Sequence, residues 1–192
     1  MSEYFKYFPT VEHDLTNVGQ KVTLTNILRR FVIRSDLVNR TDIFYDYSVQ
    51  EGDRPDIIAE KYYDDSDMAW LVLHFNQITD PYFDWPLFSQ DFTNFIKGKY
   101  GSISTAQSQV YEYRQILNEE SIRYDGTKVP KRYLVVDETT YNSLSEDSRE
   151  LITNYDYEVE RNDKNRNIRI LDKRYLNKVR DEVRTVLTNG IV

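Results

Sequence analysis

The segment from Tyr47 to Pro81, YSVQEGDRPDIIAEKYYDDSDMAWLVLHFNQITDP, constrains the fold of this chain more than any other. Tyr47 and Val49 alternate with polar residues, which is typical of a half-buried strand. Gly52 can take the positive φ that a turn after this strand requires. Pro55 suits the first turn of a helix, because it has no amide hydrogen to leave unpaired there. The segment therefore predicts a strand, a turn and a first helix over residues 55–63.

A second helix follows in the same segment. Asp53 is expected to accept hydrogen bonds from the amides of the first helix, and Asp64, Asp65 and Asp67 suit the connector and cap of the next one. A calcium loop is disfavoured, because helical residues follow at once where such a loop needs a central glycine and a distal glutamate. Apolar residues at helical spacing predict a buried helix with Met68, Leu71, Val72 and Phe75 on one face.

The aromatic run YFDWPL at residues 82–87 is the expected return strand. The resulting order of strand, helix, helix and strand is the central unit of the predicted fold. Burial of each large side chain of the second helix contributes roughly 1.5 to 3 kcal/mol to stability, so this helix is expected to stabilise the unit most.

Residues 1–44 are expected to form an aromatic arm and a short helix. Residues 1–22 show no sustained periodicity, which predicts an extended arm whose exposed aromatic side chains dock on the body of the protein or on another chain. The next stretch, TLTNILRRFVIRSDL from Thr23, is expected to form a short amphipathic helix. Its apolar face would carry Leu24, Ile27, Leu28 and Phe31.

The C-terminal region, residues 89–192, mixes helical and strand patterns. A helix is expected from Ser89 to Gly98 or Gly101, and an antiparallel sheet over residues 109–137 around the turn Asp125-Gly126. A helix capped by Ser143 and a hairpin over residues 155–171 are expected next. Asp172 is expected to cap a closing helix that packs on its own sheet or on a partner helix, with a stripe of Tyr175, Leu176, Val179, Val183, Val186 and Leu187.

Composition excludes several classes of function. The net charge of −7 opposes a phosphate backbone, so no nucleic-acid partner is expected. The chain has no cysteine, and its N-terminal residues lack the basic start and apolar run of a signal peptide. No apolar stretch is long enough to span a membrane. The 16 Tyr and 9 Phe suit interfaces as well as cores.

No arrangement of residues indicates catalysis. His74, one of only two histidines with His13, is more typical of a packed helix residue than of a catalyst. Acidic neighbours such as Asp53 and Asp56 do not predict a glycosidase pair, because the two carboxylates of such a pair must face each other across a cleft. We expect no enzyme, no catalytic residue, no metal, no cofactor and no small-molecule substrate.

The central unit resembles the LysM module. The residues that carry the resemblance are Tyr47, Val49, Gly52, Asp53, Ile58, Ala59, Tyr62, Leu71, Asn76 and Ile78. In LysM proteins a groove for N-acetylglucosamine chains lies between the loop after the first strand and the loop after the second helix. The resemblance implies a groove here at Gly52, Asp53, Arg54, Gln77, Ile78, Thr79 and Asp80. The aromatic run after this loop departs from the usual module, and neither module repeats nor Ser/Thr-rich linkers are present.

The chain as a whole resembles the small inner-baseplate wedge proteins of T4-like contractile-tailed phages, a family with a LysM-like domain. The matching segments are Tyr7-Phe8-Pro9, Thr25-Asn26-Ile27-Leu28-Arg29-Arg30-Phe31, Tyr45, Arg54-Pro55, Ala59, Tyr62, Trp70-Leu71-Val72-Leu73, Asn76, Asp80-Pro81-Tyr82, Trp85 and residues 167–171. The implied fold is α+β: a LysM-like βααβ unit over residues 45–88, with flanking helices, a small antiparallel sheet and a C-terminal helix.

The resemblance implies a structural subunit, made in the host cytoplasm and assembled into the virion. It would pack against other baseplate wedge proteins and help to join neighbouring wedges into a ring, with the LysM-like domain as a clamp surface. The expected interface residues are Tyr4, Phe5, Tyr7, Phe8, Trp70, Tyr82, Phe83 and Trp85. The alternative function is peptidoglycan binding through the two loops of the LysM-like unit.

Overall fold

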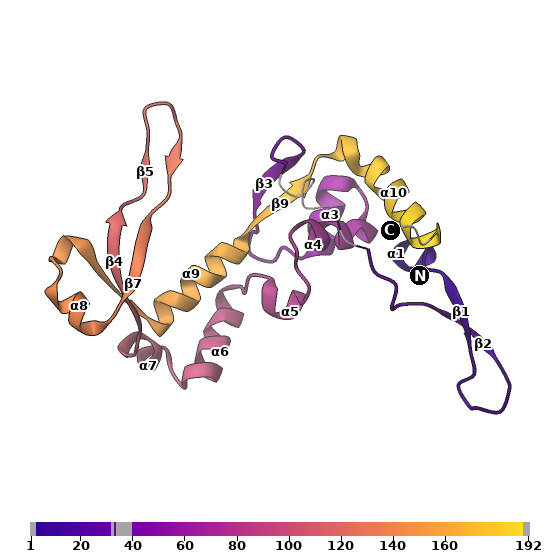
Figure 1. The fold of residues 1–192 in the computed structure, drawn as a ribbon, viewed down its shortest axis with the longest axis horizontal. Helices are drawn as coiled ribbons and strands as arrows, with labels where there is room; N and C mark the ends of the chain where they lie inside the picture. Colours follow the sequence, from indigo (N-terminus) through magenta and orange to yellow (C-terminus); the bar gives the residue numbers. More distant parts are fainter. Residues whose placement is uncertain (1–2, 32, 34–39, 190–192) are drawn as a thin grey trace. The chain divides into compact units, whose positions relative to one another are not determined.

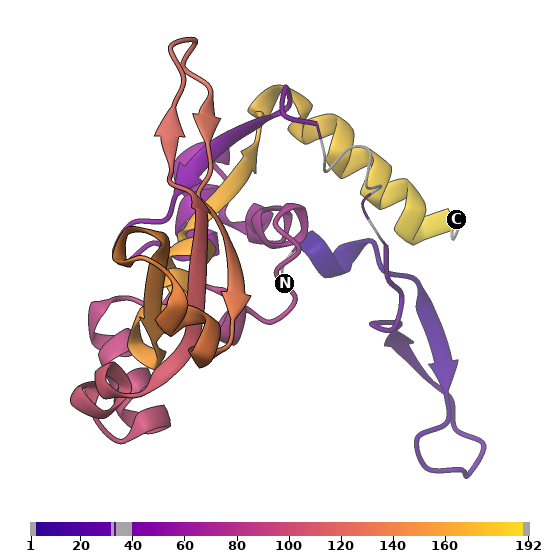
Figure 2. The ribbon, with the colours of Figure 1, turned by 60° about the vertical axis from the view of Figure 1, so that its left-hand side comes forward.

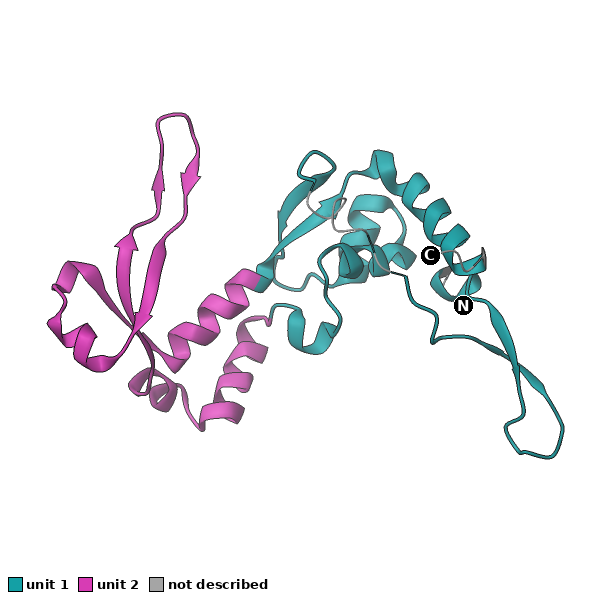
Figure 3. Ribbon diagram, in the orientation of Figure 1, with its two compact units in different colours: residues 1–86, 165–192 teal, residues 87–164 magenta. Residues whose placement is uncertain are grey.

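The computed structural model describes residues 3–31, 33 and 40–189 (Figure 1). The chain is a mixed α+β protein with small antiparallel sheets and a C-terminal helix, as the sequence predicts. It divides into two compact units (Figure 3). Unit 1 comprises residues 1–86 and 165–192, and unit 2 comprises residues 87–164. Unit 1 is therefore assembled from two segments that are distant in the sequence.

The core of unit 1 is a two-stranded sheet covered by helices. Strand β3 (Phe44–Ser48) pairs antiparallel with β9 (Asn167–Leu171), and the two lie side by side in Figure 1. Helix α3 (Pro55–Tyr63), the 3-10 turn η1 (Ser66–Met68) and helix α4 (Ala69–Phe75) follow β3, which confirms both expected helices. The side chains of this core include Val49, Ile58, Ala59, Met68, Leu71, Val72, Phe75, Trp85, Ile168, Ile170 and Leu171.

The expected return strand at residues 82–87 is wrong. Asp80 accepts a hydrogen bond from the amide of Tyr82, and Pro81 begins the short helix α5 (Pro81–Asp84). A capping aspartate followed by proline favours a helical turn over a strand. The partner of β3 is instead β9, in which Ile168 and Ile170 are both buried.

Asn76, at the end of α4, joins this helix to the backbone of β9. Its side-chain Nδ2 donates to the carbonyl oxygens of Val72 and Arg169, each at 2.8 Å, and its Oδ1 accepts from the amide of Arg169 at 2.8 Å. The amide side chain therefore pairs with β9 as a peptide group of a neighbouring strand would.

Replacing Asn76 by alanine is expected to lower the free energy of unfolding of unit 1 by about 2 kcal/mol, because two bonds to β9 are lost. Urea unfolding followed by tryptophan fluorescence measures this change. Asn177→Ala, at an exposed position of the same unit, serves as the control and should change stability by less than about 0.5 kcal/mol. Equal stability of the two variants would contradict the proposed link.

The N-terminal segment is structured, so the expectation of an extended arm is wrong. Helix α1 (Glu3–Lys6) is followed by a hairpin of β1 (Thr10–His13) and β2 (Val22–Thr25), which stands clear of the rest of unit 1 in Figure 2. The aromatic residues dock on the body of the unit, which was one of the two expected outcomes: the Tyr4 ring lies 5.6 Å from that of Trp70.

The short helix expected from Thr23 is also wrong. Thr25 pairs with Thr10 and Leu24 pairs with Val11 in the hairpin, and no helix forms over residues 26–31. The β-branched residues of both strands favour this pairing over the helical spacing of the apolar residues. Most of the remainder of the expected helix lies outside the described residues.

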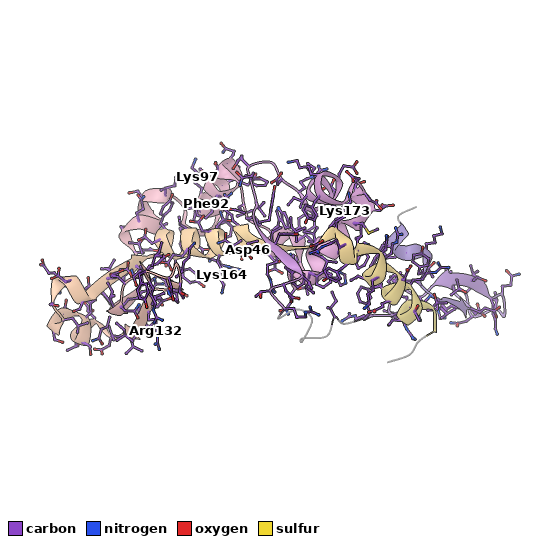
Figure 4. The ribbon with its side chains drawn as sticks, turned by 90° about the horizontal axis from the view of Figure 1, so that it is seen from above. Asp46, Phe92, Lys97, Arg132, Lys164 and Lys173 are labelled. Atoms are coloured by element: carbon purple, nitrogen blue, oxygen red, sulfur yellow. The ribbon has the colours of Figure 1, made fainter. Side chains whose placement is uncertain are left out.

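The closing helix α10 (Leu176–Asn189) is confirmed. Asp172 accepts from the amide of Arg174 and so caps the 3-10 turn η3 (Lys173–Tyr175) that precedes α10. Lys173, labelled in Figure 4, forms an ion pair with Asp64. Leu187 is buried, and α10 faces α1 and α4 across a small cavity lined by Tyr4, Tyr7, Met68, Trp70, Arg180, Val183 and Leu187.

Unit 2 contains a three-stranded antiparallel sheet. Its central strand β4 (Val110–Asn118) lies between β7 (Arg132–Val136) and β8 (Arg149–Thr153). A narrow ribbon of β5 (Ser121–Ile122) and β6 (Lys128–Val129) extends this hairpin, and Gly126 in its turn has φ of 82°. The pairing of β4 with β7 and the Asp125-Gly126 turn are therefore as expected, whereas strand β8 is an addition to the expected sheet. The other elements before α9 are helices α6 (Ser89–Tyr100), α7 (Ile103–Ser108) and α8 (Glu138–Ser143) and the 3-10 turn η2 (Glu146–Ser148).

The helix expected to start at Ser143 is wrong. Asp137 accepts from the amides of Thr139 and Thr140, so helix α8 begins earlier and ends at Ser143. The residues that follow include β8, in which Ile152 is buried against the sheet.

The hairpin expected over residues 155–171 is wrong as well, because residues 154–166 form helix α9 (Asn154–Arg166) before β9. Polar contacts hold α9 in unit 2. Glu158 is 2% exposed and accepts hydrogen bonds from Lys99 at 2.5 Å and from the hydroxyl of Tyr100 at 2.9 Å. Asn162 donates to the carbonyl of Leu87 and accepts from its amide. Apolar periodicity cannot reveal a helix held in this way.

Candidate functional site

The aromatic residues expected at interfaces fall into two groups. Phe8 and Trp85 are each only 8% exposed, so their own unit already covers them. Tyr82 and Phe83 on α5 are 88% and 73% exposed. Phe5 is also exposed, whereas Tyr4, Tyr7 and Trp70 are half-buried. The pair on α5 therefore offers the most uncovered aromatic surface of the expected interface residues.

Helix α5 presents this pair on a fixed turn. Asp80 caps the turn, and the ring of Pro81 fixes the φ angle of its first residue. The carboxylate of Asp84 accepts a hydrogen bond from the amide of Asp80 at 3.2 Å. The exposure of two large aromatic side chains to water is unfavourable. Such residues are typical anchors of protein interfaces. The two flanking carboxylates, Asp80 and Asp84, give this surface a local negative charge.

A second surface feature lies beside α1 and α4. The rings of Tyr4 and Phe8 are 5.2 Å apart, and the ring of Phe31 stacks on that of His74 at 4.8 Å with an interplanar angle of 8°. These rings border an open hollow of about 610 Å³. Its lining is Tyr4, Phe5, Phe8, Ile27, Arg29, Arg30, Phe31, Ile33, His74, Gln77, Ile78 and Thr79.

The first expected glycan loop is occupied by internal bonds. Asp53 is buried, and its carboxylate accepts from Lys61 at 2.7 Å, from the hydroxyl of Tyr47 at 2.6 Å and from the amide of Gln50 at 3.0 Å. It therefore does not cap α3 as expected: the N-cap residue is Arg54, whose side chain makes no capping bond. The Arg54 guanidinium pairs with Asp56 at 2.6 Å.

The electrostatics of Asp53 agree with this internal role. Burial alone would raise the pKa of Asp53, but the hydrogen bonds from Lys61 and Tyr47 outweigh burial and hold it below its ordinary value. Burial, and then the hydrogen bond to Asp53, raise the pKa of Tyr47 to about 12. The carboxylate is thus ionised and already satisfied by its own chain.

The second expected glycan loop, residues 77–80, does not share the hollow beside α1 with the first. Gln77, Ile78 and Thr79 line the hollow beside α1, whereas Gly52, Asp53 and Arg54 are not among its lining residues. Gly52 and Gln77 both have positive φ, 84° and 57°, as turns after a strand and a helix require. Asp80 belongs to the cap of α5.

Arg29, Arg30 and His74 line this hollow, although the sequence pattern did not single them out as surface residues of a site. His74 Nδ1 bonds to the carbonyl oxygen of Trp70 at 2.8 Å, so the ring is positioned on α4. The signal for this surface is the adjacent arginine pair in an acidic chain, but the apolar spacing of residues 27–31 predicts a helix there instead.

Residues 3–31, 33 and 40–189 contain neither a metal-binding cluster nor a membrane-spanning helix. In this part of the chain, no three His, Cys, Asp or Glu side chains gather in a way that could hold a metal ion. None of the helices described there combines the length and the apolar character needed to cross a bilayer.

Comparison with known proteins identifies the family. The search of curated proteins gave no match. The phage family described as base plate wedge protein 53 matches residues 4–185, which include α1, both units and nearly all of α10. The match thus extends over far more than half of the sequence, and the chain belongs to the base plate wedge protein 53 family.

Proposed function

We propose that the chain joins neighbouring wedge proteins of a phage baseplate into a ring through protein–protein contacts. Its family makes it a structural protein of the tail baseplate of a phage virion, associated with other baseplate proteins. The proposal adds that it is a connector, with separate surfaces for different non-identical neighbours. We further propose that it is made in the host cytoplasm before assembly.

The exposed aromatic pair on α5 is the observation that carries this proposal. Tyr82 and Phe83 are large, uncovered and held on a capped turn, which reduces the entropy lost when a partner covers them. Interfaces within stable assemblies commonly use such aromatic anchors at their centre.

We propose that residues 45–88 together with β9 form the LysM-like unit, of which all but residues 87 and 88 belong to unit 1. The order β3, α3, α4, β9 and the antiparallel pairing of the two strands support this assignment. Asp53, in the first loop, is fully engaged with Lys61, Tyr47 and Gln50. Because these internal bonds already occupy the Asp53 carboxylate, it is not available to a saccharide, which favours a module that binds polypeptides.

Replacing Tyr82 and Phe83 together by alanine is expected to weaken association with the neighbouring wedge protein by at least about tenfold, because interface anchors commonly contribute 2 kcal/mol or more. The measurement is co-purification and titration with the other wedge proteins of the same phage. Since both side chains are exposed, the free energy of unfolding should change by less than about 0.5 kcal/mol.

Tyr124→Ala is the control for this experiment. Tyr124 is fully exposed on the ribbon of unit 2, so the control removes an equally accessible aromatic ring at another place. Association of the Tyr82 and Phe83 variant at wild-type strength would remove α5 from the interface. Failure of the wild-type chain to bind any wedge protein would refute the connector function itself.

A further inference from the structure

We propose that the hollow beside α1 and α4 binds an acidic segment of another baseplate polypeptide. In this complex, an apolar side chain of the segment lies on the aromatic floor, and an adjacent carboxylate pairs with Arg29 or Arg30. The inference rests on the proposed connector function and assigns a partner chemistry to a second surface, distinct from α5.

The floor of the hollow is built to receive an apolar side chain. Tyr4 packs against Phe5 and Phe8 at ring distances of 5.1 and 5.2 Å, and against Trp70 at 5.6 Å. Phe31 lies edge-on to Trp70 at 6.0 Å, so the rings support one another. Ile27 and Ile78 add aliphatic surface, and Ile27 is exposed. An apolar side chain that enters the hollow displaces water from this surface, which is favourable.

The charge of the lining selects an acidic occupant. Arg29 and Arg30 line the hollow, and no Asp or Glu is present among the lining residues described above. This local excess of positive charge contrasts with the net charge of −7 of the whole chain. Arginine presents a planar fork of donors that matches a carboxylate and also stacks on aromatic rings. In a segment that carries a carboxylate next to an apolar side chain, the carboxylate can pair with the arginines and the apolar side chain can pack on the aromatic rings.

The volume admits a short peptide segment, and the charged groups of the lining favour it over a sugar. A hollow of about 610 Å³ is within the range that holds a few side chains. The charged donors of the lining, Arg29 and Arg30, match a carboxylate better than the uncharged hydroxyl groups of a saccharide. The first loop of the LysM-like unit, which would complete a saccharide groove, is not part of the lining.

The experiment measures binding of short overlapping peptides, tiled from the other wedge proteins of the same phage, to the full chain by fluorescence anisotropy. Peptides that bind are expected to carry Asp or Glu beside Phe, Tyr, Leu or Ile, and their affinity should fall with rising salt. Replacing Arg29 and Arg30 together by glutamate is expected to weaken this binding by on the order of 10- to 100-fold. Replacing both by lysine keeps the charge and should cause a smaller loss.

A matched control reverses two exposed arginines of unit 2, Arg123→Glu with Arg132→Glu; Arg132 is labelled in Figure 4. This control changes the net charge equally and should bind the peptides as wild type does. Circular dichroism confirms that each variant is folded.

The hollow proposal is overturned if no tiled peptide binds, if the binders are not acidic, or if both charge reversals weaken binding equally. Binding of an N-acetylglucosamine oligomer that competes at the hollow would also overturn it. If the Arg29 and Arg30 variant still co-purifies with the wedge proteins at wild-type strength, the hollow assignment fails, while the connector function stands.

Discussion

Replacing Arg114 by methionine is expected to lower the free energy of unfolding of unit 2 by about 3 to 5 kcal/mol, because a buried charge network loses its only central cation. Arg114 lies in the centre of the sheet and is 3% exposed. Its guanidinium donates to Glu160 on α9 at 2.8 and 2.9 Å and to Glu112 at 2.6 Å. The Tyr133 ring lies 4.0 Å from the guanidinium carbon.

The carboxylates around Arg114 explain the size of this effect. Burial disfavours the charged guanidinium, but the bonds to Glu160 and Glu112 outweigh burial and raise the pKa of Arg114 above its ordinary value. Without the arginine, Glu112 and Glu150 remain half-buried near one another, with Lys131 bound to Glu150 at 2.6 Å. Glu160 is half exposed and can be hydrated again, so its share of the loss is small.

Hydrogen exchange in peptides from β4 and β8 measures the Arg114 prediction within unit 2. Arg132→Met makes the same chemical change at an exposed position of β7 and should leave exchange almost unaltered. Arg114→Lys keeps the charge but cannot bridge both glutamates with a planar fork, so an intermediate loss is expected. Full protection in the Arg114→Met variant would show that the network contributes little net stability.

Truncating Trp85 to alanine is expected to destabilise unit 1 by about 3 to 5 kcal/mol. The side chain is 8% exposed, and its indole N–H donates to the carbonyl oxygen of Asp53 at 3.0 Å. The substitution removes a large ring from the core and also leaves that carbonyl without this donor. Trp85→Phe keeps most of the ring contact and should cost about 1 to 2 kcal/mol.

Urea unfolding measures the Trp85 prediction, since Trp70 remains as a fluorescent reporter in the same unit. Tyr82→Ala is the control, because this neighbouring aromatic ring is exposed and its removal should leave the unfolding midpoint unchanged. If Trp85→Ala were as stable as this control, Trp85 would not be part of the core, and its prediction as an interface residue would regain support.

Local sequence signals predicted the centre of unit 1 well. Pro55 begins α3 and Gly52 has the positive φ of the expected turn, because both depend on backbone preferences of single residues. The strand partner of β3 was missed, since pairing with β9 depends on side chains more than one hundred positions away along the sequence, such as Ile168 opposite Tyr47. Helix α9 was missed because buried Glu158 replaces the apolar residue that periodicity requires.

For the candidate surfaces as well, local sequence signals predict some features, and tertiary contacts determine the others. Composition could indicate that aromatic residues serve interfaces, but it could not separate buried Trp85 from exposed Tyr82, because that difference depends on the turn that follows Asp80. Arg29 and Arg30 lie at the hollow beside Phe31, whose ring contacts Trp70 and His74 of α4, and these are tertiary contacts. Local pattern therefore predicts elements, while tertiary contacts decide which side chains remain available.

The pairing of β3 with β9 has a consequence for synthesis on the ribosome. All of unit 2 emerges between these two strands, so its sheet and α9 can fold as a contiguous segment before β9 is translated. The sheet of unit 1 closes last, at the entropic cost of a long loop that a folded unit 2 has already shortened. The two-stranded sheet of unit 1 can therefore form only after β9 has been translated, so unit 1 completes its fold after unit 2.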